Sequence, residues 1–450
     1  MKQNKDYLIT EKPSRALLIF SIPMIIGNLF QQAYTIVDSA IVGRYVGETA
    51  LAAVGASYAL TSIFICIAIG GGIGASVIIS HHFGAHNYGR MKTGIRTALL
   101  SFLFISLILG GIGLIFSQQI MEVLNTPADA IDIAVTYLNI YFLGLPFLFM
   151  YNILSSMFNA LGESRIPLYL LIFSSVLNIF LDLYMVAVLN LGVAGAAYAT
   201  FIAQGISAVL SLIIFVVTLQ QLQGKAEGWF SKTEFSDMSR IALPSILQQS
   251  TVSIGMMLVQ SVVNSFGTQI LAGFSAAMRI ESLCVVPMSA IGNAMSSYTA
   301  QNIGAEKEER ISQGYRAGNF MIIVIAVILC FFLEIAHKPL IALFLDNEPS
   351  AQTIVTGESY LKFIGFFFCM IGFKMAVDGI LRGAGAVKVF TIANMVNLTL
   401  RVTIAKFGAP IWGVSMVWYA VPLGWLANFL ISYGYYRTEK WKEAASKTVD

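Results

Sequence analysis

Residues 93–117 read TGIRTALLSFLFISLILGGIGLIFS, a run in which Arg96 carries the only charge. A helix needs about 20 largely apolar residues to cross the hydrocarbon core of a bilayer. The run exceeds that length and is continuously apolar, whereas a strand of a membrane barrel alternates apolar and polar residues over about ten positions. The stretch therefore predicts a membrane-spanning helix.

The whole chain of 450 residues repeats this pattern. Its residues are 57% hydrophobic and 11% charged, whereas an ordinary soluble protein has about 25% charged residues, so a soluble fold is excluded. We expect twelve spanning helices, at residues 15–42, 50–79, 93–117, 131–157, 166–189, 192–219, 240–265, 270–300, 315–336, 353–380, 388–408 and 411–436.

The Lys and Arg side chains gather on one side of the predicted spans. The two termini and the loops after spans 2, 4, 6, 8 and 10 hold 20 of the 27, and the loops on the opposite side hold three, Arg44, Lys338 and Lys406. Loops with an excess of Lys and Arg stay in the cytoplasm. We therefore expect a multi-pass protein of the inner or plasma membrane, with both termini in the cytoplasm.

The net charge and the motif content exclude several other classes. A formal net charge of +3 is too small to indicate a nucleic-acid partner. The four cysteines lie apart in apolar runs without a Cys-x-x-Cys spacing, so neither a disulfide framework nor a metal site is expected, nor any cofactor. His81, His82 and His86 lie beside the loop after span 2, where we expect them to be solvated rather than to bind a metal.

Two loops 220 residues apart indicate a duplication. FGAHNYGRMKTGIR (83–96) shares five residues with IGAEKEERISQGYR (303–316), where chance gives roughly one, and Pro23 pairs with Pro244 nearby. Both loops lie on the same predicted side, so the two copies have the same orientation. The predicted fold is an all-α polytopic membrane protein with twelve transmembrane helices in two six-helix lobes around a central cavity. The expected parts are an N-lobe (1–219), a cytoplasmic linker (220–239) and a C-lobe with a short cytoplasmic tail (240–450).

Four segments resemble motifs of the multidrug and toxic compound extrusion (MATE) transporters. They are IPMIIGNLFQQAYTIVDSAIVGRYVGETALAAVG (22–55), LGESRIPLYLLIFSSVLNIFLDLYMV (161–186), GVAGAAYAT (192–200) and GILRGAG (379–385). The resemblance implies a transporter, not an enzyme, which exports organic cations or drugs against an inward flow of sodium ions or protons. It also implies cation coupling by Asp38, Asn178, Asp182 and Thr200. We expect a monomer that contacts membrane lipid and its small-molecule substrates.

Two carboxylates within the predicted spans support this interpretation independently. Asp38 lies in span 1 and Asp182 in span 5, and neither span has a Lys or Arg at a matching depth. An isolated charge at the bilayer centre costs about 2.5–3.5 kcal/mol, so each carboxylate must be neutralised, paired or hydrated. A bound proton, a bound cation or a watery cavity that admits both would satisfy them.

Other polar residues share helix faces with these two acids. Gln31 and Tyr34 lie on the face of Asp38, Asn178 lies on that of Asp182, and Thr200 and Gln204 share a face of span 6, while Tyr137 and Asn152 add polar groups to span 4. If these faces converge, Asp38, Asn178, Asp182 and Thr200 offer oxygen ligands of the kind that hard cations prefer. We assign the remaining five, Gln31, Tyr34, Tyr137, Asn152 and Gln204, to substrate binding. Alternatively, such groups bond neighbouring helices together, at about 0.6 kcal/mol each.

The second half departs from this pattern. When Asn178 is aligned with Asn397, Asp182 falls on Arg401, and no acidic residue replaces Asp38. We therefore do not expect a coupling site in the C-lobe. Lys374, Asp378 and Arg382 follow one another at a spacing of four, which we interpret as a salt-bridged ladder at the cytoplasmic end of span 10.

These observations predict a cation-coupled antiporter, driven by sodium ions or protons, whose two lobes rock to alternate access. A lipid-linked oligosaccharide or lipid flippase of similar architecture is the alternative. A flippase should present several Arg or Lys to hold a pyrophosphate, whereas the N-lobe is acidic. An intramembrane enzyme would need clustered Asp-rich motifs, whereas Asp38 and Asp182 stand singly, so no catalytic residue is expected.

Overall fold

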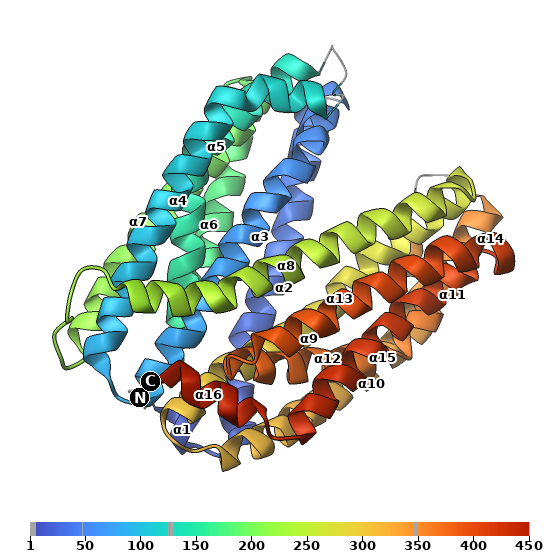
Figure 1. The fold of residues 1–450 in the computed structure, drawn as a ribbon. Coiled ribbons are helices and arrows are strands. Elements are labelled where there is room, and N and C mark those ends of the chain that lie inside the picture. Colours follow the sequence, from blue (N-terminus) through green and yellow to red (C-terminus); the bar gives the residue numbers. More distant parts are fainter. Residues whose placement is uncertain (1–5, 47, 125, 127–129, 346–349, 450) are drawn as a thin grey trace. The chain divides into compact units, whose positions relative to one another are not determined.

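The computed structural model describes residues 6–46, 48–124, 126, 130–345 and 350–449, and within these ranges every regular element is a helix (Figure 1). Eleven of the described helices are long and apolar enough to cross a membrane, and a bent pair supplies a twelfth span. The predicted all-α class with twelve spans is therefore confirmed.

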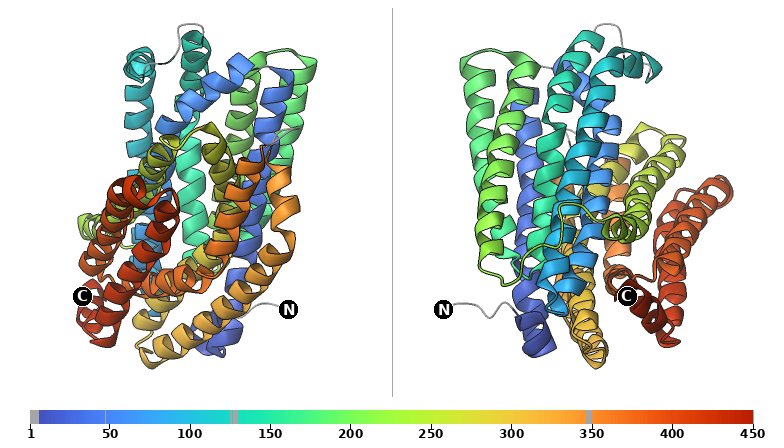
Figure 2. Two further views of the ribbon diagram at one scale, coloured as in Figure 1. Left: turned by 90° about the vertical axis from the view of Figure 1, so that its right-hand side faces the viewer. Right: turned by 60° about the vertical axis from the view of Figure 1, so that its left-hand side comes forward.

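The first half contributes six spans, which appear blue to green in both views of Figure 2. They are α2 (Pro13–Tyr45), α3 (Glu48–Gly84), α4 (Tyr88–Val123), α5 (Ile131–Ala160), α6 (Arg165–Asp182) with the π-helical turn η1 (Leu183–Val188), and α7 (Gly192–Gln220). A short helix, α1 (Tyr7–Thr10), precedes them. Several of these helices extend beyond the predicted apolar runs, because polar residues at their ends continue the helical backbone.

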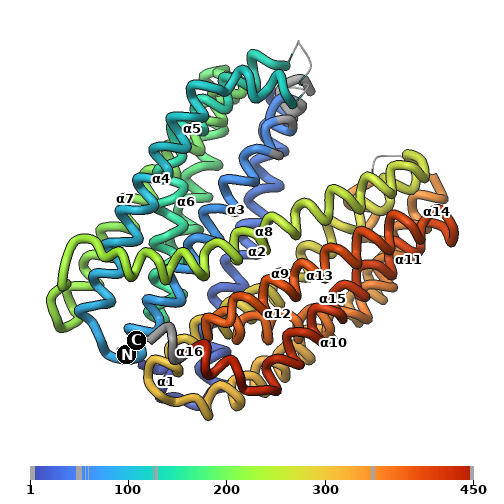
Figure 3. The backbone as a smooth tube through the Cα atoms, in the orientation of Figure 1, coloured from blue at the N-terminus to red at the C-terminus, as the bar shows by residue number. Residues whose placement is uncertain are grey.

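The second half contributes the remaining spans (Figure 3). They are α8 (Lys232–Asn264), α9 (Thr268–Gly304), α10 (Glu309–Leu343), α11 (Ala351–Gly365), α12 (Phe368–Gly383), α13 (Val387–Thr403) with the π-helical turn η2 (Ile404–Gly408) and α14 (Ala409–Trp412), and α15 (Ser415–Arg437), before the terminal α16 (Trp441–Val449). The predicted span 353–380 is bent by 52° between α11 and α12. The bend follows Gly365, a residue type with low helix propensity.

The two halves repeat the same backbone irregularities. His86 and Glu306, which the sequence repeat aligns, both adopt the left-handed conformation, with φ of 53° and 56°, in the turns α3–α4 and α9–α10. Helices α6 and α13 both continue into a π-helical turn. Asp182 directly precedes the first of these turns, and Arg401 lies shortly before the second. The duplication therefore extends to local backbone geometry.

Contacts between residues divide the chain into two units. One comprises residues up to Ile25 together with those from Leu247 onward, and the other comprises Ile26–Ile246. Both divisions fall inside a helix, α2 and α8. This division follows contact rather than sequence similarity, so the lobe boundaries at residues 219 and 240 stay a prediction.

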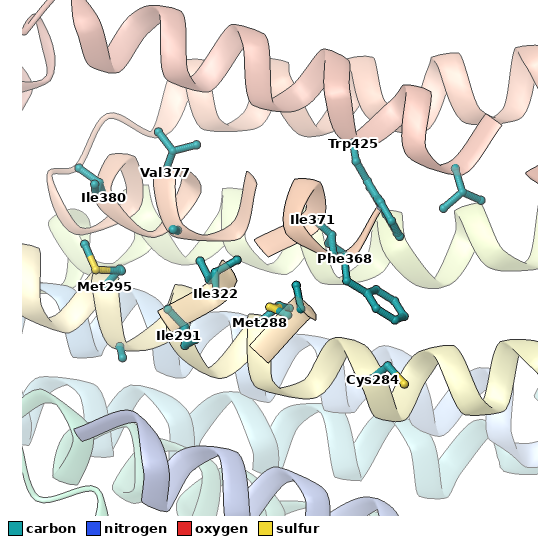
Figure 4. Close-up of a cluster of buried hydrophobic side chains, with 14 of the residues drawn as sticks. Cys284, Met288, Ile291, Met295, Ile322, Phe368, Ile371, Val377, Ile380 and Trp425 are labelled. Atoms are coloured by element: carbon teal, nitrogen blue, oxygen red, sulfur yellow. The ribbon is translucent and has the colours of Figure 1, made fainter. Parts of the chain in front are cut away.

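Each unit has its own apolar core. In the unit that contains the C-terminus, Met288, Ile291 and Met295 of α9 line a core shared with α12 and with Trp425 of α15 (Figure 4). In the other unit, Phe142 of α5 packs edge-on against Phe64 of α3, with ring centroids 5.6 Å apart. Helices α4 and α5 approach closely there, and Gly113 of α4 permits this because it has no side chain. A Cβ atom at this position would lie 2.4 Å from the ring of Phe142.

The histidines beside the α3–α4 turn correct one expectation. His81 and His82 are buried rather than solvated, and Nε2 of His82 lies 3.0 Å from Oε2 of Glu234 at the start of α8. His86 is exposed, as expected, and its Nδ1 lies 2.9 Å from the Tyr88 hydroxyl. The prediction is wrong for His81 and His82, and for His82 the reason is Glu234, a residue 152 positions away that folds against it.

Candidate coupling and substrate site

Asp38 and Asp182 meet inside the unit of residues 26–246. Asp38 lies on α2 and Asp182 is the last residue of α6, and their carboxyl groups are within hydrogen-bonding reach of each other. Asp182 is fully buried and Asp38 is half-buried. Two bare carboxylates in such contact would repel each other, so the pair requires a positive charge, either a shared proton or a bound cation.

Asn178 connects this pair to a third helix. With its amide turned so that the nitrogen faces Asp182, Nδ2 donates to Oδ2 of Asp182 at 2.9 Å, and Oδ1 accepts from the backbone N–H of Thr200 on α7 at 3.0 Å. The same nitrogen lies 2.5 Å from the hydroxyl oxygen of Tyr34 on α2. This orientation gives both the nitrogen and the oxygen of the Asn178 amide suitable partners, which is the criterion for placing an amide. The helix faces predicted for α2, α6 and α7 therefore converge.

No fixed cation neutralises the acids within the described part of the chain. Every ion pair found there involves a carboxylate other than Asp38 and Asp182. Among the described residues, no hydrogen-bond donor reaches the buried Oδ1 atom of either aspartate. The same ranges contain no group of three or more His, Cys, Asp and Glu side chains that could hold a metal ion. The carboxyl pair thus has free acceptor atoms for a mobile ligand.

An aromatic recess adjoins the carboxyl pair in the same unit. Tyr137 and Tyr141 of α5 and Phe201 of α7 line a small open recess, together with Thr200 and Gln204. Tyr137 lies close enough to both aspartates to experience their charge. Aromatic faces attract organic cations through the ring quadrupole. The recess therefore combines an aromatic wall with nearby negative charge.

The structure brings seven of the nine predicted site residues together and leaves two apart. Asp38, Asn178, Asp182, Thr200 and Tyr34 form the hydrogen-bonded cluster, and Tyr137 and Gln204 line the recess beside it. Asn152 and Gln31 are not brought into the cluster. Nδ2 of Asn152 donates to the carbonyl of Leu148 on its own helix at 2.8 Å. Gln31 is exposed, and among the described residues its side chain makes no hydrogen bond to the cluster.

Tyr141 and Phe201 line the recess and were not predicted from the sequence. Tyr141 lies four positions after Tyr137, so the spacing of a helix face could have found it. Phe201 directly follows Thr200 in an apolar run, where an aromatic ring resembles a lipid-facing side chain. The functional roles of all these residues stay predictions.

The position equivalent to Asp182 is basic in the second half. Arg401 of α13 is 8% exposed, and no acceptor in the described residues reaches its Nε atom. Glu281 of α9 lies near enough to interact with it electrostatically and accepts a hydrogen bond from the Tyr360 hydroxyl at 2.6 Å. This unit therefore places a buried cation where the other unit places a buried acid.

The second half also contains a buried ion pair. Nζ of Lys374 lies 2.9 Å from Oδ2 of Asp378, as the predicted ladder requires, and Ser432 donates to Oδ1 of Asp378 at 2.7 Å. Arg382 does not continue the ladder, because its guanidinium donates instead to Oδ1 of Asn293 at 2.8 Å. Fixed side chains thus supply the counter-charge and the hydrogen bonds of this pair.

Comparison with known proteins identifies the family. A family model for MatE matches residues 23–184 and 244–406, and its two parts begin at Pro23 and Pro244, the pair that the sequence repeat aligns. The chain belongs to the MATE family. The probable multidrug resistance protein YpnP of Bacillus subtilis (strain 168) is 32% identical to it over 430 residues, which cover 95% of this chain and 96% of that protein. The probable multidrug resistance protein YoeA of the same strain is 27% identical over 459 residues, 97% of each chain.

A solved structure agrees with this membership in the MATE family. The outward-facing conformation of a multidrug resistance MATE family transporter has a TM-score of 0.89 and 24% identity, and the match covers 99% of this chain and 100% of that one. A structural similarity at 24% identity shows that this chain has the same two-lobed fold as that transporter. The expectation of a multidrug efflux transporter that is not an enzyme is confirmed. The flippase alternative finds no support in these MATE relatives.

Proposed function

We propose that this MATE transporter exports organic cations in exchange for an inward-moving cation that binds between Asp38 and Asp182. The observation that supports this most is the contact between their carboxyl groups, which no Lys or Arg in the described residues neutralises. A mobile positive charge must then reside at the pair. When the coupling ion and the cargo compete for the same negative site, each displaces the other, which is the requirement for antiport.

A proton is the coupling ion that fits this arrangement best. One proton shared between the two carboxyl groups would add a hydrogen bond to the one that Asn178 donates to Asp182. Asn178 presents its amide nitrogen to Asp182, whereas a sodium ion would require an oxygen ligand there. Sodium is the alternative coupling ion, and its binding would require rotation of this amide.

The recess beside the acids supports organic cations as the cargo. Tyr137, Tyr141 and Phe201 provide aromatic faces without fixed hydrogen-bond geometry for a particular cargo. A cation over such a face gains about 0.5–2 kcal/mol, and flat rings accept cargoes of different shape. The names of the relatives YpnP and YoeA, which denote multidrug resistance, agree with a broad substrate range.

The concentration gradient of the coupling ion supplies the free energy for a one-for-one exchange. One cation moves in as one monovalent organic cation moves out, so no net charge crosses the membrane and the membrane potential contributes nothing. Each tenfold concentration ratio of the coupling ion releases about 1.4 kcal/mol, which supports a tenfold substrate gradient. A second inward cation in each cycle would add about 2.3 kcal/mol for each 100 mV of membrane potential.

Ethidium efflux from vesicles tests the proposal. Wild-type protein should export ethidium when a proton gradient is imposed, while Asp38→Asn and Asp182→Asn should not respond to the gradient. Asp132→Asn, the same change at an exposed position of α5, is the matched control and should behave as wild type. A sodium gradient in place of the proton gradient distinguishes the two ions. Gradient-driven efflux that is undiminished in both variants would contradict the proposal.

We also propose that both termini lie on the cytoplasmic side of the cell membrane. The 20 Lys and Arg on that side of the spans support this orientation. Segments near both termini also contact one turn of the unit that contains the C-terminus: Nζ of Lys307 donates to the carbonyl of Ile9 at 3.0 Å, and Nζ of Lys442 lies 3.8 Å from Oε2 of Glu308. Protease treatment of intact cells should therefore leave a tag on the C-terminal tail uncut, and cleavage would contradict the orientation.

A further inference from the structure

The connection between α7 and α8 is bound along the start of α4. We call residues 221–231 the strap; it forms the loop between α7 and α8 in Figures 1 and 3. The backbone N–H groups of Glu227 and Ser231 donate to the hydroxyls of Thr93 and Thr97, both at 2.9 Å. Nζ of Lys92 donates to two strap carbonyls at 2.8 Å. The strap is thus a fixed surface rather than a free linker.

Aromatic rings project from the strap and from the helix that follows it. The exposed fractions are 73% for Trp229, 49% for Phe230 and 40% for Phe235. The Arg96 guanidinium lies over the Trp229 ring, 4.6 Å from its centroid, and the rings of Phe230 and Phe235 are 6.0 Å apart. Exposed apolar surface costs about 25 cal/mol for each Å² left in water. Trp and other amphipathic rings are enriched where membrane meets water, which relieves this cost.

The contact between Arg96 and Trp229 lies at the end of the exposed apolar surface of α4. Leu100 and Phe104 follow Arg96 at spacings of four and eight, and both are exposed on the helix surface. One helical turn of four residues advances by about 6 Å, so the apolar surface of α4 begins one turn beyond the Arg96–Trp229 contact. On α7, the exposed residue Val217 lies shortly before the strap. The strap therefore borders two lipid-facing helix surfaces.

We propose that the strap is a lipid-binding surface: Trp229 and Phe230 insert at the boundary of headgroups and acyl chains, and Arg96 and Lys232 bind lipid phosphates. Only Nη1 of Arg96 is engaged with a strap carbonyl in the described residues, that of Gly228, and the guanidinium has further N–H donors for a phosphate. Lys232 is exposed at the start of α8, and the strap contains one acid, Glu227. An amphipathic surface of this kind enters the interface by about 5–10 Å.

Insertion at this place links the bilayer to the start of α8. Glu234, three residues beyond the strap, is held between His82 and Arg90, with ion-pair distances of 3.0 Å and 3.7 Å. A displacement of the strap would therefore act on the contacts that fix α8 to the α3–α4 turn. The lipid composition of the bilayer would act on the transporter through this connection.

Quenching of Trp229 fluorescence tests the inference on the full-length chain in phosphatidylcholine liposomes. The contribution of Trp229 is the difference between wild type and Trp229→Phe, a conservative change at an exposed position. This contribution should be lost when the lipid is replaced by phosphatidylcholine brominated in the upper acyl chain, and it should resist aqueous iodide. The contribution of Trp425, obtained in the same way from Trp425→Phe, comes from a buried position and should be quenched by neither the brominated lipid nor iodide. Strong quenching of Trp229 by iodide, without quenching by the brominated lipid, would overturn the proposal.

The phosphate contacts are tested by a second variant. Arg96→Gln combined with Lys232→Gln should weaken the quenching of Trp229 by brominated lipid, since this variant lacks the two cationic side chains that bind lipid phosphates beside the ring. Unchanged quenching in this variant would overturn the phosphate contacts.

Discussion

The two halves of the chain share a backbone and differ in charge at the corresponding position. Asp182 precedes the π-helical turn of the first half, where it contacts Asp38, and Arg401 lies shortly before the π-helical turn of the second. The acids have no fixed cation among the described residues, whereas Lys374 and Asp378 of the second half satisfy each other. The difference indicates that the two halves share a fold, whereas the described residues of the first half leave a pair of buried acids without a fixed cation.

Removal of one partner of the fixed pair should have the largest effect. Asp378→Asn leaves the ammonium group of Lys374 buried without its counter-ion, which should lower the free energy of unfolding by about 3–5 kcal/mol. Lys374→Met with Asp378→Leu removes both charges and should be nearly neutral. Thermal unfolding in detergent measures both variants. Equal unfolding temperatures of the single and double variants would contradict the claim that Lys374 depends on Asp378 as its counter-ion.

A smaller effect is expected from the amide that joins the mobile site. Asn178→Ala removes the hydrogen-bond donor to the buried Asp182 carboxyl group, a loss of about 1–3 kcal/mol. At about 1.4 kcal/mol for each factor of ten, binding of the coupling ion should weaken by about 5- to 150-fold. The ion dependence of ethidium efflux measures this shift. Asn397→Ala, at the aligned position of the second half, is the matched control, and an equal shift there would remove the distinction between the halves.

The smallest effect on transport is expected at Arg401. If coupling resides in the first half, Arg401→Gln should keep gradient-driven efflux, because no coupling ion binds at this cation. Its thermal stability should fall below that of wild type, since the buried Glu281 would lose the nearby positive charge of Arg401. Vesicle efflux and thermal unfolding check the two expectations. Loss of coupling as complete as that expected for Asp182→Asn would break the comparison.

The sequence predicts the spans, the duplication and the convergence of the acidic site. Apolar runs of span length determine the helices, and residue spacing determines which side chains share a face, as for Asn178 and Asp182. Spacing does not determine a rotamer, so it could not show that Asn152 bonds to the carbonyl of Leu148 on its own helix. Phe201 was missed because an aromatic ring in an apolar run carries no signal of the recess that it lines.

Contacts between distant segments were the least predictable. The burial of His82 depends on Glu234, which follows a polar segment that the sequence marks as a linker. The break between α11 and α12 follows Gly365, although other glycines lie inside continuous helices such as α3. Local sequence does not distinguish these cases, because packing against other helices decides whether a weak position breaks.

The release of a cation on substrate binding tests the central claim most directly. Tetraphenylphosphonium, an organic cation, is added to purified protein in weakly buffered solution, and released protons and sodium ions are measured. We predict that wild-type protein releases a proton on binding, or a sodium ion if sodium is the coupling ion, and that Asp38→Asn with Asp182→Asn releases neither. Binding that is equally tight in both proteins, without release of either ion, would contradict the assignment of a mobile positive charge to this carboxyl pair.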